Sequence, residues 1–252
     1  MDKLPLSVLL LARDEETRLQ TLLPSLGFAR ELVVVVDANS RDRTREVAAS
    51  YGARICERPL DDFGRQRQFG LDHCREDWVL WLDADEKLDA TAEGAVREAI
   101  ARPDGAAGYR IARRTWFLGQ RIRHCGWGGE RVLRLFRRAA ASFDDAPVHE
   151  RVTIRGTVQE LGGTLEHRSY ERWSECRDKL FRYSAAGAEK ARREGRRAGP
   201  LDVWLRPPLR FLRMYVLQAG LLDGARGFAV CLLGAGQVWL KYMDLWLDRR
   251  ER

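Results

Sequence analysis

The sequence predicts an α/β protein in which a doubly wound, mixed sheet is followed by a helical C-terminal region. Two observations support this class. Residues 6–13 and 31–40 are near-continuous apolar runs, dense in Val and Leu, which are typical of strands buried on both faces of a parallel sheet. Between them, leucines recur at helical spacing and the segment closes at Gly27. A strand, a helix and a strand in this order indicate a right-handed parallel crossover.

The same alternation continues beyond the first crossover, and then the pattern changes. After about residue 103, aromatic and charged residues interleave, which indicates strands that are partly antiparallel. From about Trp173 the chain becomes helical, with a basic connector at 192–200 and two helices hinged at Asp223 and Gly224. The remaining expected elements are helices at 42–52, 63–75 and 91–102 and strands at 53–58, 78–83, 108–119, 131–138 and 150–154.

Composition separates the function classes only in part. The 252 residues carry 44 basic and 37 acidic side chains, a net charge of +7, and most of the basic residues are arginine. Arginine suits phosphate, but an arginine bias also follows from genome composition. The basic residues are spread along the chain among acids, so no continuous basic stripe supports nucleic-acid binding, and we expect no nucleic-acid partner.

The cysteines and the apolar segments indicate a cytoplasmic location. Five scattered cysteines without a CxxC pair predict buried free thiols in a reducing compartment. The apolar run at the N-terminus is too short for a signal peptide, and nothing in residues 1–200 approaches the roughly 20 apolar residues of a spanning helix.

Carboxylates follow the buried run in "WVLWLDADEKL". Because ligands bind beyond the carboxyl ends of the strands of an open α/β sheet, Asp83 and Asp85 are candidate ligands for one hard cation. An extended backbone would point both to the same side, while Ala84 points away and leaves room for a ligand. Mg²⁺ is commonly held by one or two carboxylates plus substrate phosphates, so we expect a diphosphate as the next ligand. Glu86 is a further candidate carboxylate, and an ordinary acidic turn is the alternative.

Four segments together resemble the family 2 glycosyltransferases, which are inverting enzymes. They are "LLLARDEE", "VVVVDANSRDRT", "DDFGRQRQFGLD" and "LDADE", in the order in which that family has its motifs. The segments "FLGQRIRHCGW", "RLFRR", "VHE", "RYSAAGA" and "LLDGARGF" are similar to the branch of lipopolysaccharide-core β-1,4-glucosyltransferases.

This resemblance implies a Rossmann-like GT-A fold and a nucleoside diphosphate sugar as donor, UDP-glucose within the branch. It also implies Mg²⁺ or Mn²⁺ as the cofactor and a glycolipid or lipopolysaccharide-core acceptor. We therefore expect a catalytic domain at 1–170, with a nucleotide-sugar half at about 1–103 and an acceptor half at about 104–170. A helical region at 171–252 would follow it.

The resemblance also implies donor contacts. Ala12, Arg13 and Glu15 lie in the first turn, beside the nucleoside in this family, although Glu15 also suits the first turn of a helix. Asp37 would recognise a uracil ring; the alternative is a cap for the helix at 42–52.

Three further positions belong to the same donor site. Asn39 stands where the family has its second glycine, and Asn tolerates a left-handed backbone. Arg67 matches the arginine of the family and can pair with phosphate or stack on the base. Gln68 replaces the usual Asn, which leaves its role open.

An inverting transfer needs a separate carboxylate as general base, because a metal-bound carboxylate is a poor base. Glu150, with His149 beside it, is the first candidate, and Glu130 is the second, where the branch usually has Asp. The alternatives are an ion pair of Glu130 with Arg131 or Arg134 and a loop-holding role for His149. Trp127 is a candidate for sugar contact, although most Trp residues serve packing.

His124 and Cys125 are adjacent residues of types that bind metals. They have no second pair of ligands, so a core or loop role is the favoured interpretation.

The segment 204–247 places aromatic and aliphatic residues beside arginines. One interpretation is an interfacial helix pair at the cytoplasmic face of the inner membrane. A helical lid or a dimer contact is the alternative. A nucleotidyltransferase, the competing enzyme class, would need a glycine-rich phosphate loop, and "ARDEE" has no glycine.

Overall fold

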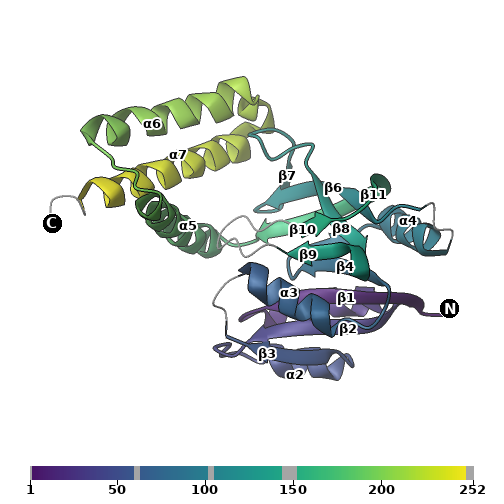
Figure 1. Ribbon diagram of the computed structural model, residues 1–252. Coiled ribbons are helices and arrows are strands. Elements are labelled where there is room, and N and C mark those ends of the chain that lie inside the picture. Colours follow the sequence, from purple (N-terminus) through teal and green to yellow (C-terminus); the bar gives the residue numbers. More distant parts are fainter. Residues whose placement is uncertain (1, 60–62, 102–104, 144–151, 248–252) are drawn as a thin grey trace. The chain divides into compact units, whose positions relative to one another are not determined.

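The computed structural model describes residues 2–59, 63–101, 105–143 and 152–247 (Figure 1). The chain forms two compact units. The first contains Met1–Arg113 and Glu130–His167, and the second combines Arg114–Gly129 with Arg168–Arg252. Residues 114–129, which we expected in the acceptor half, therefore join the helical region.

The first unit alternates strands and helices as predicted. Its elements are β1 (Leu4–Ala12), α1 (Glu16–Leu22), the 3₁₀ helix η1 (Leu23–Leu26), β2 (Ala29–Asp37), α2 (Thr44–Ser50), β3 (Arg54–Arg58), α3 (Phe63–His73), β4 (Trp78–Asp83), β5 (Glu86–Leu88), α4 (Ala90–Ala101), β8 (Arg131–Arg137), the 3₁₀ helix η2 (Arg138–Ala140), β9 (Ala141–Phe143) and β10 (Val152–Ile154). Two longer strands, β6 (Gly108–Phe117) and β11 (Val158–Tyr170), begin in this unit and end in the second. The sequence did not predict β5, β9 or β11.

The strands form one mixed sheet in the order β3-β2-β1-β4-β8-β6-β11-β5. The first four along this order are parallel to one another, whereas β8 runs antiparallel to both β4 and β6, and β5 runs antiparallel to β11. This arrangement confirms the predicted doubly wound, mixed α/β fold. The strands β9 and β10 pair separately.

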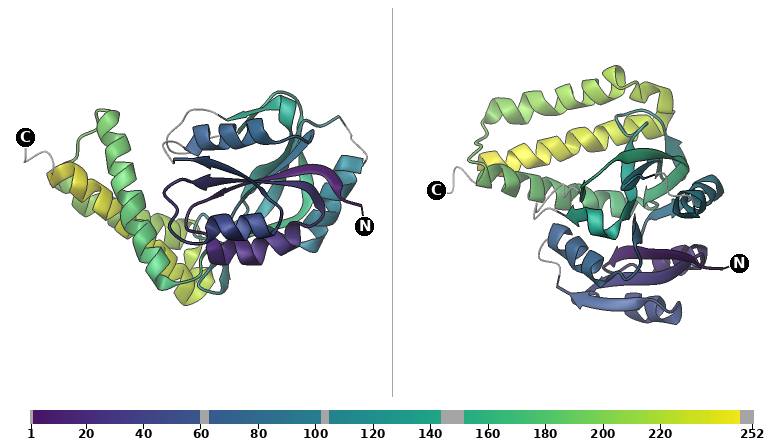
Figure 2. Two further views of the ribbon diagram at one scale, coloured as in Figure 1. Left: turned by 90° about the horizontal axis from the view of Figure 1, so that it is seen from below. Right: turned by 45° about the vertical axis from the view of Figure 1, so that its right-hand side comes forward.

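Both faces of β1, β2 and β4 are buried along most of their length, which explains their continuous apolar runs. Polar and apolar residues do not alternate along these strands, because successive side chains enter two different cores. Val8 and Leu10 belong to the core beneath α1, α2 and α4, whereas Leu9, Val35 and Trp81 belong to the core beneath α3. The left view of Figure 2 shows α3 on one side of the sheet and α1 and α2 on the other. Each fully buried aliphatic side chain contributes roughly 1.5–3 kcal/mol to folding.

The second unit is mainly helical. Besides the ends of β6 and β11 it contains β7 (Gln120–Ile122), α5 (Trp173–Arg193), α6 (Pro200–Leu212), the π-helix η3 (Arg213–Leu217), the 3₁₀ helix η4 (Gly220–Asp223) and α7 (Gly224–Leu247). Both α5 and α6 pack against α7. The helix α7 begins at Gly224, but the break between the two helical stretches lies at residues 218–219, before the predicted hinge at Asp223 and Gly224. All five cysteines are buried free thiols, as predicted.

Within the described residues, no single helix is long and apolar enough to cross a membrane. The two stretches Pro200–Leu217 and Gly220–Leu247 meet that test of length and composition only as a pair, and they are bent by 74° relative to each other.

Candidate active site

The carboxyl ends of three parallel strands meet at one edge of the sheet. Leu11 in β1 pairs with Asp83 in β4, and Ala12 pairs with Val36 in β2. Asp37, the last residue of β2, therefore lies at the same edge as Ala12 and Asp83. This is the edge at which ligands of open α/β sheets bind.

The loops after β1 and β2 are tied to each other. Asp14 adopts the left-handed conformation, with φ 54°, which Asp tolerates better than most residues. In this conformation its Oδ1 accepts a hydrogen bond from the backbone N of Arg41, at 2.7 Å, and the backbone N of Glu15 donates to Thr44 Oγ1, at 2.8 Å. The two loops therefore form one connected surface beside the end of β2.

Asp37 is buried within this surface. Its side chain is 1% exposed, its Oδ1 accepts a hydrogen bond from the backbone N of Asn39, at 3.0 Å, and its Oδ2 lies 3.2 Å from Nη1 of Arg13. Asn39 is not left-handed, since among the described non-glycine residues a positive φ occurs only at Asp14, Leu118, Cys125 and Ala219.

Contacts at the starts of α1 and α2 bear on the alternative roles of Asp37 and Glu15. The N-cap residue of α2 is Arg43, and no side-chain cap hydrogen bond is found there. Asp42 Oδ1 accepts a hydrogen bond from the backbone N of Thr44, the first residue of α2, at 3.0 Å. Glu15 pairs with Arg18 at 2.9 Å, as a carboxylate at the start of a helix does.

The acidic segment after β4 is a turn. Ala84 and Asp85 connect β4 to β5, so the backbone is not extended from Asp83 to Asp85 as we expected. Alternation along a strand therefore does not orient these carboxylates. Asp85 Oδ2 lies 3.6 Å from Nε2 of His167, which β11 places there by pairing with Glu86 in β5.

Glu86 points into the interior and holds this turn. Its side chain is 1% exposed, and its Oε2 accepts a hydrogen bond from the backbone N of Asp83 at 3.1 Å. Its Oε1 accepts from Nη2 of Arg134 at 2.8 Å. These contacts tie the buried carboxylate of Glu86 to the turn.

Two buried arginines share the indole ring of Trp81. The guanidinium carbon of Arg134 lies 4.1 Å from the ring centroid, and that of Arg67 lies 4.4 Å from it, both within the range of cation–π attraction. Each also reaches Asp83: Nη2 of Arg134 lies 2.9 Å from Oδ2, and Nη2 of Arg67 lies 3.4 Å from Oδ1. The turn therefore presents carboxylates beside concentrated positive charge.

Burial and charge act against each other in this cluster. Burial raises the pKa of Glu86, and the nearby Arg134 opposes this shift. Burial lowers the pKa of Arg67, against the attraction of Asp83. For Arg134 burial alone would lower the pKa, but the carboxylates of Glu86 and Asp83 outweigh it and raise the pKa. Arg134 is therefore a permanent positive charge in the site.

Glu130 forms an ion pair with Arg113, whose backbone N also donates to the Glu130 carbonyl oxygen at 2.8 Å. The alternative partners of Glu130 pair with other carboxylates: Arg131 pairs with Glu160, at 3.3 Å, and Arg134 pairs with Asp83 and Glu86. The other candidate base, Glu150, and its neighbour His149 lie outside the described residues.

Comparison with known proteins identifies the fold and the family. Residues 7–152 match the model of glycosyl transferase family 2. The chain is 31% identical over 245 residues to the lipopolysaccharide core biosynthesis glycosyltransferase LpsC of Rhizobium meliloti (strain 1021), covering 94% of this chain and 90% of that protein. The chain belongs to glycosyl transferase family 2.

Two further comparisons agree with this assignment. An uncharacterised glycosyltransferase of Rickettsia typhi is 23% identical over 251 residues, covering 95% of this chain and 86% of that protein. The solved structure of the mannosyltransferase PcManGT from Pyrobaculum calidifontis superposes with a TM-score of 0.55 at 14% identity, covering 98% of this chain and 89% of that one. This likeness shows the GT-A fold. The family match and the similarity to LpsC show that the chain is a glycosyltransferase.

Three further residues singled out from the sequence of this family 2 glycosyltransferase, Gln68, Trp127 and His124, bind or pack against other residues of the chain. Gln68 donates from Nε2 to Asp72 at 2.7 Å, and its Oε1 accepts from the backbone N of Phe143 at 2.9 Å, so it ties α3 to β9. Trp127 lies in the second unit, stacked on Tyr170 with ring centroids 5.5 Å apart. The backbone N of His124 donates to Asp223 Oδ2 at 2.8 Å, which confirms a loop role for His124.

The carboxylates of the acidic turn could bind a hard cation only together with oxygen atoms from a bound substrate. No cluster of three or more His, Cys, Asp or Glu side chains suited to a metal is found in the part of the chain that the structure describes. Asp83 and Asp85 supply carboxylate oxygens, which suit Mg²⁺ or Mn²⁺, and phosphate oxygens of a substrate would complete the coordination.

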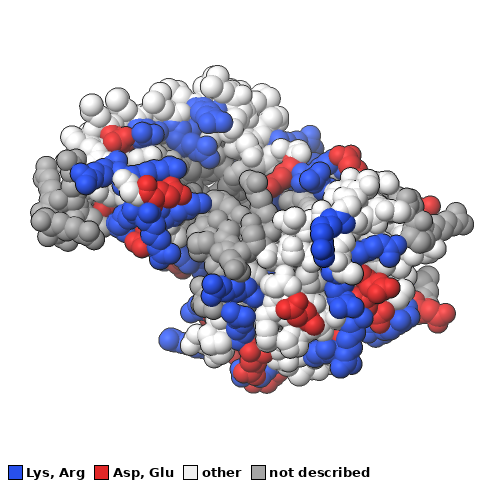
Figure 3. Space-filling view, in the orientation of Figure 1, with Lys and Arg blue, Asp and Glu red and all other residues white. Residues whose placement is uncertain are grey.

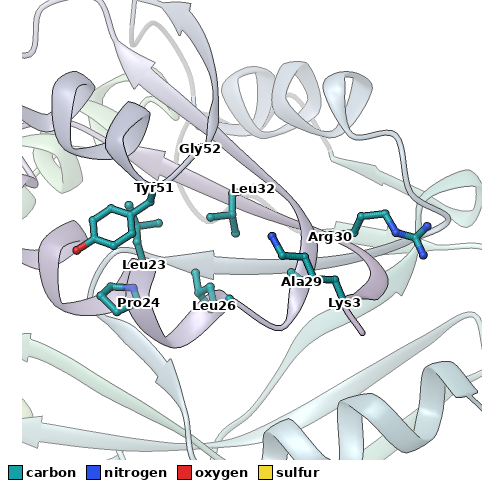
Figure 4. Close-up of a pocket in the computed structure, with 10 residues that line it drawn as sticks. Lys3, Leu23, Pro24, Leu26, Ala29, Arg30, Leu32, Tyr51 and Gly52 are labelled. Atoms are coloured by element: carbon teal, nitrogen blue, oxygen red, sulfur yellow. The ribbon is translucent and has the colours of Figure 1, made fainter. Parts of the chain in front are cut away.

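A small hollow elsewhere on the first unit is not this site. Lys3, Leu26, Ala29 and Arg30 line it together with Tyr51 (Figure 4). It lies where β1 and β2 begin, at the opposite ends of the strands from Ala12 and Asp37. Because sugar nucleotides and other ligands of open α/β sheets bind at the carboxyl ends, we assign it no role in donor binding.

The groups that orient the acidic turn were not predicted from the sequence. Arg134 was considered only as a partner for Glu130, and Arg113, His167 and Trp81 were not considered as site residues. One signal was present: Arg134 stands two residues before the apolar Phe136 in "RVLRLFRR", a spacing that places both side chains on one face of a strand. His167 could not be placed, because its strand was not predicted.

Proposed function

We propose that this glycosyltransferase moves glucose from UDP-glucose to a hydroxyl of a lipopolysaccharide-core acceptor, with inversion at the anomeric carbon and with Mg²⁺ or Mn²⁺ bound. The observation that carries the proposal is the turn at Asp83 and Asp85, which lies at the same sheet edge as Asp37 and beside Arg67. The name of LpsC supports the acceptor class, because that relative is a lipopolysaccharide core biosynthesis glycosyltransferase.

The donor would be held by residues of the first unit. Asp37 would accept an N–H of the uracil ring. Ala12 ends the neighbouring strand β1, and Arg13, Glu15 and Asn39 lie in the two connected loops that follow β1 and β2. Arg67 and Arg134 would attract the diphosphate, because guanidinium groups pair well with phosphate oxygens. Gln68 supports this half by holding β9 against α3. In this arrangement 1–103 is the nucleotide-sugar half.

Asp83 and Asp85, with Ala84 between them, would hold the divalent cation. Bound there, the cation supplies Lewis-acid chemistry that offsets the charge developing on the leaving diphosphate. Arg134 fixes Asp83 at 2.9 Å and Glu86 at 2.8 Å, so the protein orients the acidic turn before any ligand arrives. Such preorganisation avoids a cost of rearrangement during the reaction.

The acceptor hydroxyl needs a base on the face of the sugar opposite the diphosphate. We assign Glu150 as this base, with His149 beside it, and retain Glu130 as the second candidate. The ion pair with Arg113 already occupies the carboxylate of Glu130, so we rank it second. Trp127 remains a candidate for acceptor or sugar contact, within an acceptor half that we expected at 104–170.

A transfer assay tests this function. The purified protein would be incubated with Mn²⁺, a heptose-terminated lipopolysaccharide core and UDP-glucose, UDP-galactose, UDP-N-acetylglucosamine or GDP-mannose in turn. We expect transfer from UDP-glucose and a β-linked product by NMR. Preference for another donor would overturn the choice of sugar, and an α-linked product would overturn inversion. We place the reaction at the cytoplasmic face of the inner membrane because this acceptor is anchored in lipid.

A further inference from the structure

We infer that the second unit binds the surface of an anionic membrane through a face formed by α6, η3 and the turn before α7. We call it the α6 face; it consists of Leu201, Trp204, Leu205, Leu209, Leu212, Val216, Leu217, Leu221 and Leu222, all exposed. Trp204 is 72% exposed and Leu217 is 81% exposed. Exposed apolar residues that are contiguous in this way mark a surface that binds a partner or a membrane.

The spacing of these residues places them on one side of the helix. Leu201, Leu205 and Leu209 recur every four residues, so they share a face. Val203, Pro207 and Met214 lie on the other side and are buried. Because α6 packs on α7 with that buried side, the helix has one apolar face inside the protein and a second one outside.

Arginines follow the flank between the two apolar sides. Arg206, Arg210 and Arg213 recur at spacings of four and three residues and are all exposed. Arg206 pairs with Asp202 at 2.6 Å, whereas no ion pair of Arg210 or Arg213 is found among the described residues. In Figure 3, uncharged atoms form the rim over α6 and a band of basic side chains runs beside it.

This pattern is typical of a helix that lies in the plane of a lipid surface. Leu and Trp side chains enter the boundary between head groups and acyl chains, while arginines reach back to anionic head groups. A spanning arrangement does not fit, because the three arginines would enter the hydrocarbon and the two halves are bent by 74°. An antiparallel twofold contact with a second copy would bring the two stripes of arginines to the same edge, whereas anionic lipid neutralises them.

The inference deepens the proposed function by naming the surface that brings the enzyme to a lipid-anchored acceptor. Its test needs neither donor nor acceptor, so it can fail independently of the transfer assay. The full-length protein would be sedimented with vesicles of phosphatidylglycerol and phosphatidylethanolamine, and with vesicles of phosphatidylcholine alone. We expect stronger binding to the anionic vesicles, weakened by salt.

Two variants and their matched controls locate the surface. Leu205→Ser with Leu209→Ser should weaken binding on the order of a hundredfold, through lost apolar burial. Arg210→Glu should weaken binding to anionic vesicles about fivefold or more, since each basic residue near such a surface contributes roughly 1 kcal/mol. The controls Phe181→Ser and Arg177→Glu change exposed residues of α5 and should bind like the unaltered protein.

Three results would overturn the inference. They are equal binding to both kinds of vesicle, variants that bind as well as their controls, and a dimer in solution that the Leu205→Ser, Leu209→Ser variant abolishes. The last result would assign the α6 face to a second copy of this chain. Thermal unfolding of each variant would be measured as well, so that a loss of binding is attributed to the surface only in a folded protein.

Discussion

Arg134 bridges Asp83 and Glu86 with a single guanidinium nitrogen, which lies 2.9 Å from one carboxylate and 2.8 Å from the other. The first carboxylate belongs to the end of β4 and the second begins β5, so one buried side chain holds both ends of the acidic turn. Arg134 therefore couples the stability of the sheet to the geometry of the site.

We predict that Arg134→Ala lowers the free energy of unfolding by about 3–5 kcal/mol, because it leaves the buried Glu86 without its partner. Urea denaturation would measure the change. The control is Arg131→Ala, which removes a neighbouring arginine that is 40% exposed and should change the free energy by about 0.5 kcal/mol or less. Replacing Arg134 and Glu86 together by Met should restore much of the loss. Equal effects of the two single substitutions would contradict the bridge.

For the metal site, we predict that UDP raises the melting temperature only when Mg²⁺ or Mn²⁺ is present, and more than GDP, CDP or ADP does. At about 100 times Kd a ligand stabilises by roughly 2.7 kcal/mol. Asp85→Asn should abolish the metal-dependent part of the shift, whereas Asp178→Asn, at an exposed position on α5, should keep it. A shift by UDP that is the same with and without metal would refute the cation site.

For the general base, we predict that Glu150→Gln lowers kcat by about 10²–10⁴, the usual contribution of general base catalysis. Glu130→Gln should lower it less than about tenfold, because Glu130 is paired with Arg113. Both variants should retain the UDP-dependent thermal shift, which separates loss of chemistry from loss of donor binding. The reverse ranking would make Glu130 the base, and normal turnover by both would reject the pair.

Burial raises the pKa of Cys74 to about 12, because the charged thiolate is disfavoured in the core beneath α3. In the unfolded chain a thiol ionises near pH 8.5. Between about pH 8.5 and 12 the unfolded state therefore releases a proton that the folded state keeps. We predict that the stability of the protein relative to Cys74→Ala falls by about 1.4 kcal/mol per pH unit in this range.

Denaturant titrations of both proteins between pH 8 and 10.5 would measure this difference. A constant difference across the range would show that Cys74 does not contribute to the pH dependence. As a second readout, iodoacetamide at pH 8 should label Cys74 only after unfolding, because the folded thiol stays protonated.

The sequence alone predicted the helices and strands that have strong local patterns. The strand at Trp78–Asp83 was predicted within its observed bounds, because five apolar residues precede the acidic segment. Asp37 and Asp83 could be placed at one sheet edge because the carboxyl ends of neighbouring parallel strands meet there.

The strand β11 could not be predicted, because tertiary contacts determine it. It contains Gly162 and Gly163 among charged residues, a composition that disfavours strands. At Gly163, with φ 78°, a Cβ atom would lie 2.1 Å from the backbone N of Ala92, so the glycine allows β11 to pass close to the start of α4. The periodicity of apolar residues along the sequence cannot reveal such a close approach of two backbone segments. The position of His167, which follows in this strand, was therefore unpredictable as well.

The second unit is built from two separated parts of the chain, and this limits how the enzyme can be shortened. Phe117, Ile122 and Cys125 from the first part share one core with Cys176 and Met214 from the second. A protein that stops near residue 170 would expose that core and would aggregate before its chemistry could be studied. Because the excursion at 114–129 and the helical tail share this core, we expect homologues to gain or lose them together.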